Sequence, residues 1–163
     1  MKEFFLIKKN KEKLLDVIES WVGVPYVHMG ETKRGIDCTK LIAAVFYEMG
    51  VLTDFQKGEY YQDDWYRHSK EDKVLNSFSD HIRKFLRKDL MVKAFSYDRK
   101  KDSLLFGDVL CFKYDKSKMV NHTGFYLENF VFHAATDSIV KKEQWRAAYK
   151  RLCHYYYRLY LKD

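Results

Sequence analysis

Three stretches of the chain carry apolar residues at the spacing of an α-helix. Residues 11–22 place their apolar side chains on one stripe, which predicts an amphipathic helix. Residues 38–49 are apolar on nearly every side and precede Gly50, a residue type common just beyond a helix end, so a buried helix is predicted there. Residues 69–93 are predicted to be helical in part, from the spacing of Ile82, Phe85, Leu86 and Leu90.

The later part of the chain changes to the patterns of β-strands. Stretches rich in aromatic and β-branched residues predict strands at 106–113, 123–127, 130–135 and 152–161. Residues 141–150 predict a short helix, and residues 98–103 predict a loop. Helices that are segregated from an antiparallel sheet form an α+β pattern, which is the fold class we expect.

Two histidines lie in one predicted hairpin. If Glu128 and Asn129 form a two-residue turn, His133 pairs with Gly124, and His122 lies on the same face of the sheet. The two histidines are then diagonal neighbours with Cβ atoms roughly 7–8 Å apart, so one ring can hydrogen-bond the other. A loop of odd length would place them on opposite faces. A single histidine on a strand is usually a core residue, but two on one face predict a chemical site.

Cys38 opens the predicted buried helix. Asp37 is a good N-cap, because its carboxylate can accept the free backbone N–H groups of the first turn. The positive end of a helix stabilises a thiolate, so Cys38 can have a lowered pKa and act as a nucleophile, and Lys40 would add positive potential. The alternative is that Cys38 is a small buried hydrophobe. The histidine pair, which can supply a base, favours the nucleophile.

Composition and charge narrow the remaining classes. The 163 residues predict one domain, 1–163, with a full core. The odd number of cysteines, three, argues against a disulfide framework, and no apolar run is long enough to span a membrane. The net charge of +7 favours anionic partners such as wall polymers, acidic membranes or nucleic acid. Nucleic acid is the less expected partner, because the basic residues are spread and form no known module.

Five segments of the chain together match the pattern of one protein family. They are Gly23-Val24-Pro25-Tyr26, Gly35-Ile36-Asp37-Cys38, Phe106-Gly107-Asp108-Val109-Leu110, His122-Thr123-Gly124-Phe125-Tyr126-Leu127 and Phe132-His133-Ala134. Through these segments the chain resembles the NlpC-type cell-wall cysteine peptidases, which have a papain-like fold. The resemblance covers roughly residues 12–52 and 104–161, and the order cysteine, histidine, histidine fits. It is weaker for Tyr60 to Trp65, which is similar to the phage-tail-associated branch of the family.

The resemblance implies a cysteine hydrolase that cleaves peptidoglycan stem peptides between D-glutamate and the diamino acid. Cys38 would be the nucleophile, His122 the base and His133 the orienting residue. Tyr26 and Asp37 would lie on the oxyanion or substrate side, with the Cys38 backbone N–H in the oxyanion site. No metal or cofactor is expected, because the three residues lack the short paired spacings of zinc sites.

The chain departs from the family pattern on the substrate side. Thr39-Lys40 stands where the family usually has Ser-Gly, and Val27-His28-Met29-Gly30 stands where a Trp or Arg and paired glycines are usual. Two alternatives therefore stay open. One is a related thiol amidase or acyl transferase on a non-wall substrate. The other is a non-catalytic module of the same fold that binds wall or nucleic acid.

The N-terminus bears on where the protein acts. Its apolar stretch of four residues is too short for the core of a signal peptide. The chain as written is therefore expected in the cytoplasm, from which lysis could release it, or in a phage particle.

Overall fold

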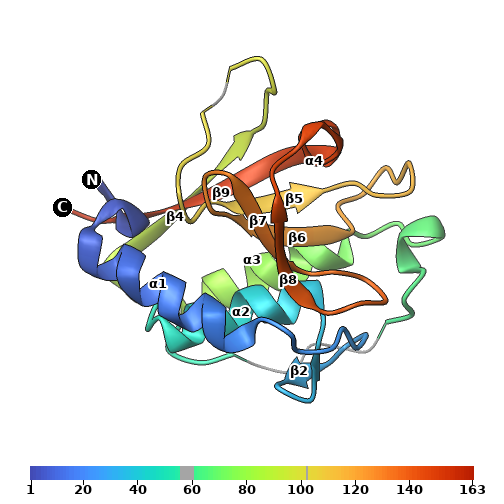
Figure 1. Cartoon of the computed structure of the whole chain (residues 1–163), viewed down its shortest axis with the longest axis horizontal. Helices are drawn as coiled ribbons and strands as arrows, with labels where there is room; N and C mark the ends of the chain where they lie inside the picture. The colour runs from blue at the N-terminus through green and yellow to red at the C-terminus, as the bar shows by residue number, and fades with distance from the viewer. Residues whose placement is uncertain (56–60, 102) are drawn as a thin grey trace.

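The computed structural model describes residues 1–55, 61–101 and 103–163, and within them the three longer helices cover one face of an antiparallel sheet (Figure 1). The helix α2 contacts both α1 and α3. Two 3₁₀ turns, η1 (Phe4–Leu6) and η2 (Trp65–Arg67), accompany the helices. The helices are α1 (Lys8–Trp21), α2 (Cys38–Glu48), α3 (Lys73–Phe85) and the short α4 (Ala147–Leu152).

The described strands form one seven-stranded sheet and one small hairpin. The sheet order is β1-β9-β5-β6-β7-β8, with β4 also paired to β9, and every pair is antiparallel. The small hairpin pairs β2 (Glu31–Thr32) with β3 (Gly35–Ile36) just before α2. The large sheet contains β1 (Lys2–Glu3), β4 (Leu90–Ser96), β5 (Val109–Phe112), β6 (His122–Tyr126), β7 (Phe130–Ala134), β8 (Val140–Gln144) and β9 (Cys153–Leu161). The predicted α+β class is confirmed.

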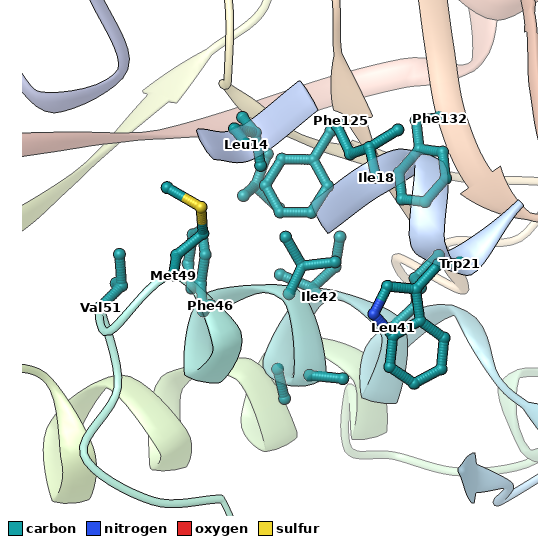
Figure 2. Packing of buried hydrophobic residues seen from close by; sticks show 14 of the residues in the cluster. Leu14, Ile18, Trp21, Leu41, Ile42, Phe46, Met49, Val51, Phe125 and Phe132 are labelled. Carbon is teal, nitrogen blue, oxygen red and sulfur yellow. The ribbon is translucent and has the colours of Figure 1, made fainter. Parts of the chain in front are cut away.

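The core explains why α2 is apolar on nearly every side. Every residue from Cys38 to Phe46 is buried, because α2 lies between α1, α3 and the sheet. Figure 2 shows Leu14 and Ile18 of α1 above α2, beside Phe125 and Phe132 of the sheet. The ring of Phe46 meets that of Phe125 with centroids 5.6 Å apart. This packing fixes the start of α2, where Cys38 stands, relative to β6 and β7.

The segment Gly107-Asp108 ties the entry of β5 to the end of the chain. Gly107 has a φ of 87°, and a Cβ atom there would lie 2.4 Å from the Phe5 ring, so only glycine fits. Asp108 is buried and accepts hydrogen bonds from the Leu105 N–H at 2.7 Å and from Arg158 Nε and Nη2 at 2.8 Å each. This part of the family motif therefore serves the fold.

The predicted hairpin register is confirmed. Phe125 pairs with Phe132 and Tyr126 with Val131, as a two-residue turn at 128–129 requires. The N–H of Leu127 donates to the carbonyl of Phe130 at 2.8 Å, which closes that turn. Glu128 takes up a φ of 65°, the left-handed conformation that such tight turns use.

One sequence prediction is wrong. Residues 141–150 do not form a helix: Val140–Gln144 is strand β8, and only Ala147–Leu152 is helical. Pairing of β8 with β7 over five residues explains the difference, because tertiary pairing overrides a helical pattern. The prediction that residues 69–93 are helical in part is confirmed by α3, which ends at Phe85. Strand β4 begins at Leu90, where it pairs with β9 over seven residues.

The described residues of the loop 98–103 contain neither helix nor strand, and Asp102 lies outside the described residues. Among the residues that the structure describes, no helix combines the length and apolarity needed to cross a bilayer.

Candidate active site

The two hairpin histidines contact each other directly. His122 Nε2 lies 2.7 Å from His133 Nδ1, and the rings meet edge to face. Both side chains are almost fully buried, at 1% and 3% exposure. Gly124 makes room for them, since a Cβ atom there would lie 3.1 Å from the Cβ of His133 and 2.9 Å from the Phe132 carbonyl oxygen. The predicted pairing of the two histidines on one face is confirmed.

Cys38 is held at the start of α2 by its neighbours. One oxygen of Asp37 accepts the Lys40 N–H at 2.7 Å, which is the predicted N-cap, and the other accepts the Met29 N–H at 3.1 Å. The Thr123 hydroxyl donates to the Cys38 carbonyl at 3.0 Å. Since Thr123 directly follows His122, this bond joins the cysteine to the histidine strand.

The sheet presents its histidines on the face away from α2. Side chains alternate across a strand, so His122 and His133 point to the opposite side from Phe125 and Phe132, which pack on the helix. The helix can therefore meet the histidines only at the end of the sheet where β6 begins. Cys38, the first residue of α2, lies at that end.

Tyr114 covers the imidazole of His122. The two rings stack with centroids 4.7 Å apart and planes 20° apart. Burial raises the pKa of the Tyr114 hydroxyl, and negative charge on Tyr149 and Cys38 raises it further. The Tyr114 ring thus covers the imidazole of His122 and lies within electrostatic range of the Cys38 thiol.

Glu143 is a member of the site that the sequence analysis missed. In the β7–β8 register His133 pairs with Lys141, so Glu143, two residues further along β8, projects from the same face. Its Oε2 lies 2.7 Å from His133 Nε2, and the Tyr149 hydroxyl donates to the same oxygen. Glu143 could have been placed in the site if residues 140–144 had been interpreted as an edge strand, but the sequence pattern predicts a helix at 141–150.

Burial sets the resting protonation states. It lowers the pKa of His122 well below its usual value, and the neighbouring His133 adds to this. Burial also lowers the pKa of His133. The hydrogen bond to Glu143 raises this pKa, but the effect of burial is larger. Burial raises the pKa of Cys38 to about 11, and the charge of Asp37 contributes. The pKa of Cys38 is therefore raised where the helix start predicts a lowered one, because burial disfavours the charged thiolate.

We expect Cys38 to react first with iodoacetamide at neutral pH. Burial raises the pKa of Cys153 to about 12 and that of Cys111 well above its usual value, so Cys38 supplies the largest thiolate fraction. Because its own pKa is raised to about 11, labelling should accelerate roughly tenfold per pH unit between about pH 7 and pH 9. Limited labelling followed by peptide mapping measures both effects. Earlier labelling of Cys111 or Cys153 would contradict the assignment, and a rate independent of pH would reveal a preformed thiolate.

Tyr26, which the resemblance places on the oxyanion or substrate side, lies within electrostatic range of the Cys38 thiol. Its backbone bridges Ile36 and donates to the Ser138 carbonyl at 2.9 Å, which fixes the segment before the small hairpin. Burial raises the pKa of its hydroxyl, and negative charge on Cys38 and Asp37 raises it further. The Tyr26 hydroxyl is therefore protonated at neutral pH and can donate a hydrogen bond near Cys38.

Tyr61 is a second residue near the thiol that sequence reasoning did not place. Burial raises the pKa of its hydroxyl, as do the charges of Asp37 and Cys38, whereas a hydrogen bond with Thr39 lowers it. His28 Nε2 lies 2.6 Å from the Tyr61 carbonyl oxygen. The departures from the family pattern at 27–30 and 39–40 therefore adjoin this tyrosine. Tyr60, in the same quoted segment, lies outside the described residues.

Across residues 1–55, 61–101 and 103–163, no three His, Cys, Asp or Glu side chains gather in a group that could hold a metal ion.

The fold is that of the papain-like cysteine peptidases, with a cysteine at a helix start and histidines on an antiparallel sheet. Solved structures support this. An NlpC/P60 family protein from Bacillus cereus ATCC 10987 matches with a TM-score of 0.57 and 16% identity over 89% of this chain and 38% of its own. A protein described as similar to lipoprotein, NLP/P60 family, from Staphylococcus aureus Mu50 matches with a TM-score of 0.56 and 16% identity. That match covers 90% of this chain and 40% of the other protein. The chain thus spans about two fifths of these two proteins.

A third structure matches over nearly its whole length. The NlpC/p60 domain of the peptidoglycan hydrolase SagA gives a TM-score of 0.51 and 15% identity over 93% of this chain and 97% of that one. A search of curated proteins finds no significant match. The model of the NlpC/P60 family matches residues 23–158, and the chain belongs to this family, whose members are generally cysteine peptidases. The family prediction is confirmed, while the phage-tail branch stays a prediction.

Proposed function

We propose that the protein is a cysteine peptidase that cleaves the peptide stem of peptidoglycan between D-glutamate and the diamino acid. The observation that carries the proposal is the buried His122–His133 pair, 2.7 Å apart, beside a helix that begins with Cys38. A nucleophile, a base and an orienting group in this order form the arrangement that thiol acyl transfer requires.

In the proposed first step, Cys38 Sγ attacks the carbonyl carbon of the scissile amide. Because His122 Nε2 faces His133, its Nδ1 is the nitrogen left to take the thiol proton. The pKa shifts favour a neutral thiol and a neutral imidazole at rest, so proton transfer accompanies attack. The protonated His122 then gives its proton to the leaving amine, and a thioester remains on Cys38.

In the second step, His122 takes a proton from water, and the resulting hydroxide attacks the thioester. The acid product leaves, and the thiol regains its proton. Both tetrahedral intermediates carry an oxyanion, for which the Cys38 backbone N–H and the Tyr26 hydroxyl are the proposed donors. The raised pKa of Tyr26 supports this role, since the hydroxyl keeps its proton. The two oxygens of Asp37 accept the backbone N–H groups of Met29 and Lys40, so Asp37 would position the segment that carries the Cys38 N–H.

The family of the chain supports a wall substrate. The chain belongs to the NlpC/P60 family, and the SagA domain that it resembles is described as part of a peptidoglycan hydrolase. The net charge of +7 favours approach to an anionic wall.

Digestion of purified sacculi tests the proposal and separates it from its alternatives. We expect wild-type protein to release stem-peptide fragments, identified by liquid chromatography and mass spectrometry. Sacculi that sediment with the protein but stay intact would instead indicate a binding module. Intact sacculi together with turnover of small thioesters or amides would indicate a thiol amidase or acyl transferase on another substrate.

We expect His133→Ala to be a milder lesion than His122→Ala. An orienting residue has only to hold one hydrogen bond to the base, so its loss should lower kcat about 10- to 100-fold. His133→Gln should retain more activity than His133→Ala, because the amide oxygen can accept from His122. Initial rates of stem-peptide hydrolysis give the order of severity. An unchanged rate for His133→Ala, or a His133→Gln variant as inactive as His122→Ala, would contradict the orienting role.

A further inference from the structure

A chain of hydrogen bonds runs from the base to a carboxylate at the sheet edge. His122 Nε2 meets His133 Nδ1 at 2.7 Å, and His133 Nε2 meets Glu143 Oε2 at 2.7 Å. The two histidines are almost fully buried, whereas the Glu143 side chain is 22% exposed. His133 uses both of its ring nitrogens in this chain, so the protonation of Glu143 constrains that of His133, and His133 in turn constrains His122.

The carboxylate fixes the direction of every bond in this chain. An ionised carboxylate can only accept, so His133 Nε2 must carry a proton and donate it to Glu143. A neutral His133 then has a bare Nδ1, which can only accept from His122 Nε2. A neutral His122 with its proton on Nε2 has a bare Nδ1. That nitrogen is the one the proposed reaction needs as a base.

We propose that Glu143 is a positioning residue that sets the tautomers of His133 and His122, so that His122 presents an unprotonated Nδ1 to Cys38. The inference rests on the proposed function for its chemical meaning, but the tautomers themselves are a property of the resting protein.

The surroundings of Glu143 keep it ionised. Burial alone would raise its pKa, but hydrogen bonds from Tyr149 and His133 hold the pKa below its usual value. Two cations also face it, with Lys141 Nζ 3.5 Å and Arg146 Nη2 3.9 Å from its Oε1. The acceptor end of the chain is therefore a carboxylate at neutral pH.

Removal of the Glu143 carboxylate would allow the other tautomers of His133 and His122. With no acceptor beyond it, His133 can carry its proton on Nδ1 and donate to His122 Nε2. A neutral His122 then carries its proton on Nδ1 and cannot accept one from the thiol. A glutamine at 143 would behave differently, because its amide oxygen can still accept from both His133 and Tyr149. Comparing alanine with glutamine therefore separates the control of tautomers from the effect of charge.

Long-range ¹⁵N–¹H correlation NMR of histidine side chains reads the tautomers directly. The proteins are wild type, Glu143→Ala, Glu143→Gln and a control, Glu128→Gln, which removes a carboxylate at the hairpin turn. We expect wild type, Glu143→Gln and the control to show Nε2–H on both His122 and His133 at pH 7.5. We expect Glu143→Ala to show an Nδ1–H population on both. Signals are assigned with His122→Gln and His133→Gln.

Kinetics supply the second readout. Glu143→Ala should lower kcat about 10- to 100-fold with little change in KM, and Glu143→Gln should recover most of the loss. An Nδ1–H tautomer in wild type, or unchanged Nε2–H tautomers in folded Glu143→Ala, would overturn the proposal. The NMR measurement needs no substrate. If the proposed wall substrate is wrong, no turnover will be measured, but the tautomers of His122 and His133 will still test this proposal.

Discussion

Replacing Cys38 with alanine is expected to abolish hydrolysis, with a fall in rate of about 10⁴-fold or more. The change removes the only atom that forms the thioester. The fold should survive, because Asp37 still caps α2 through backbone N–H groups and the Thr123 hydroxyl still bonds the backbone carbonyl at position 38. Release of soluble fragments from sacculi measures the rate, and the thermal unfolding midpoint reports the fold.

Cys153→Ala is the matched control for this variant. Its thiol is as buried as that of Cys38, at 5% against 6% exposure, but it lies on β9 and has no role in the proposed chemistry. Its activity should stay within about twofold of wild type once stability is taken into account. A Cys38→Ala protein that cleaves at the wild-type rate would rule out the thiol mechanism.

His122→Ala is expected to have the second largest effect, a loss of about 10³- to 10⁴-fold in kcat. The thiol, whose pKa is raised to about 11, loses the base that takes its proton, and the leaving amine loses its acid. His154→Ala, which removes an exposed histidine from β9, is the control. Near-normal turnover by His122→Ala would mean that another group acts as the base.

The pH dependence gives an independent check on His122. Burial lowers its pKa, so the imidazole should stay neutral, and the enzyme active, below the ordinary histidine value of about 6.5. Activity should be lost only as the pH falls further, through the lowered pKa. The profile of kcat/KM against pH measures this limb. An acidic limb above pH 6.5 would contradict the buried, neutral base.

The histidine hairpin could be predicted because its information is local. Both strands and their turn lie within 122–135, so alternation and a two-residue turn at Glu128 and Asn129 were enough to set the register. The buried helix was equally clear, since its apolar surface matched a place between α1, α3 and the sheet. These two elements hold Cys38, His122 and His133.

The places of Glu143 and Tyr61 in the site could not be predicted from the sequence, because their positions depend on distant segments. Residues 140–144 became a strand by pairing with β7, and only that register brings Glu143 to His133. Tyr61 reaches the start of α2 from a middle segment whose path no local pattern dictates. The raised pKa of Cys38 could not be predicted from the sequence for the same reason, because packing creates the burial of Cys38 and its place in the helix does not.

The most direct test of the central claim uses one defined stem peptide, L-alanyl-γ-D-glutamyl-diamino acid-D-alanine. Wild type and Cys38→Ala are each incubated with it, and the products are read by mass spectrometry. The account predicts two fragments, split between D-glutamate and the diamino acid, with wild type and none with Cys38→Ala. Equal cleavage by both proteins would contradict it. So would an intact peptide after incubation with wild-type protein whose Cys38 is shown by alkylation to be free and reactive.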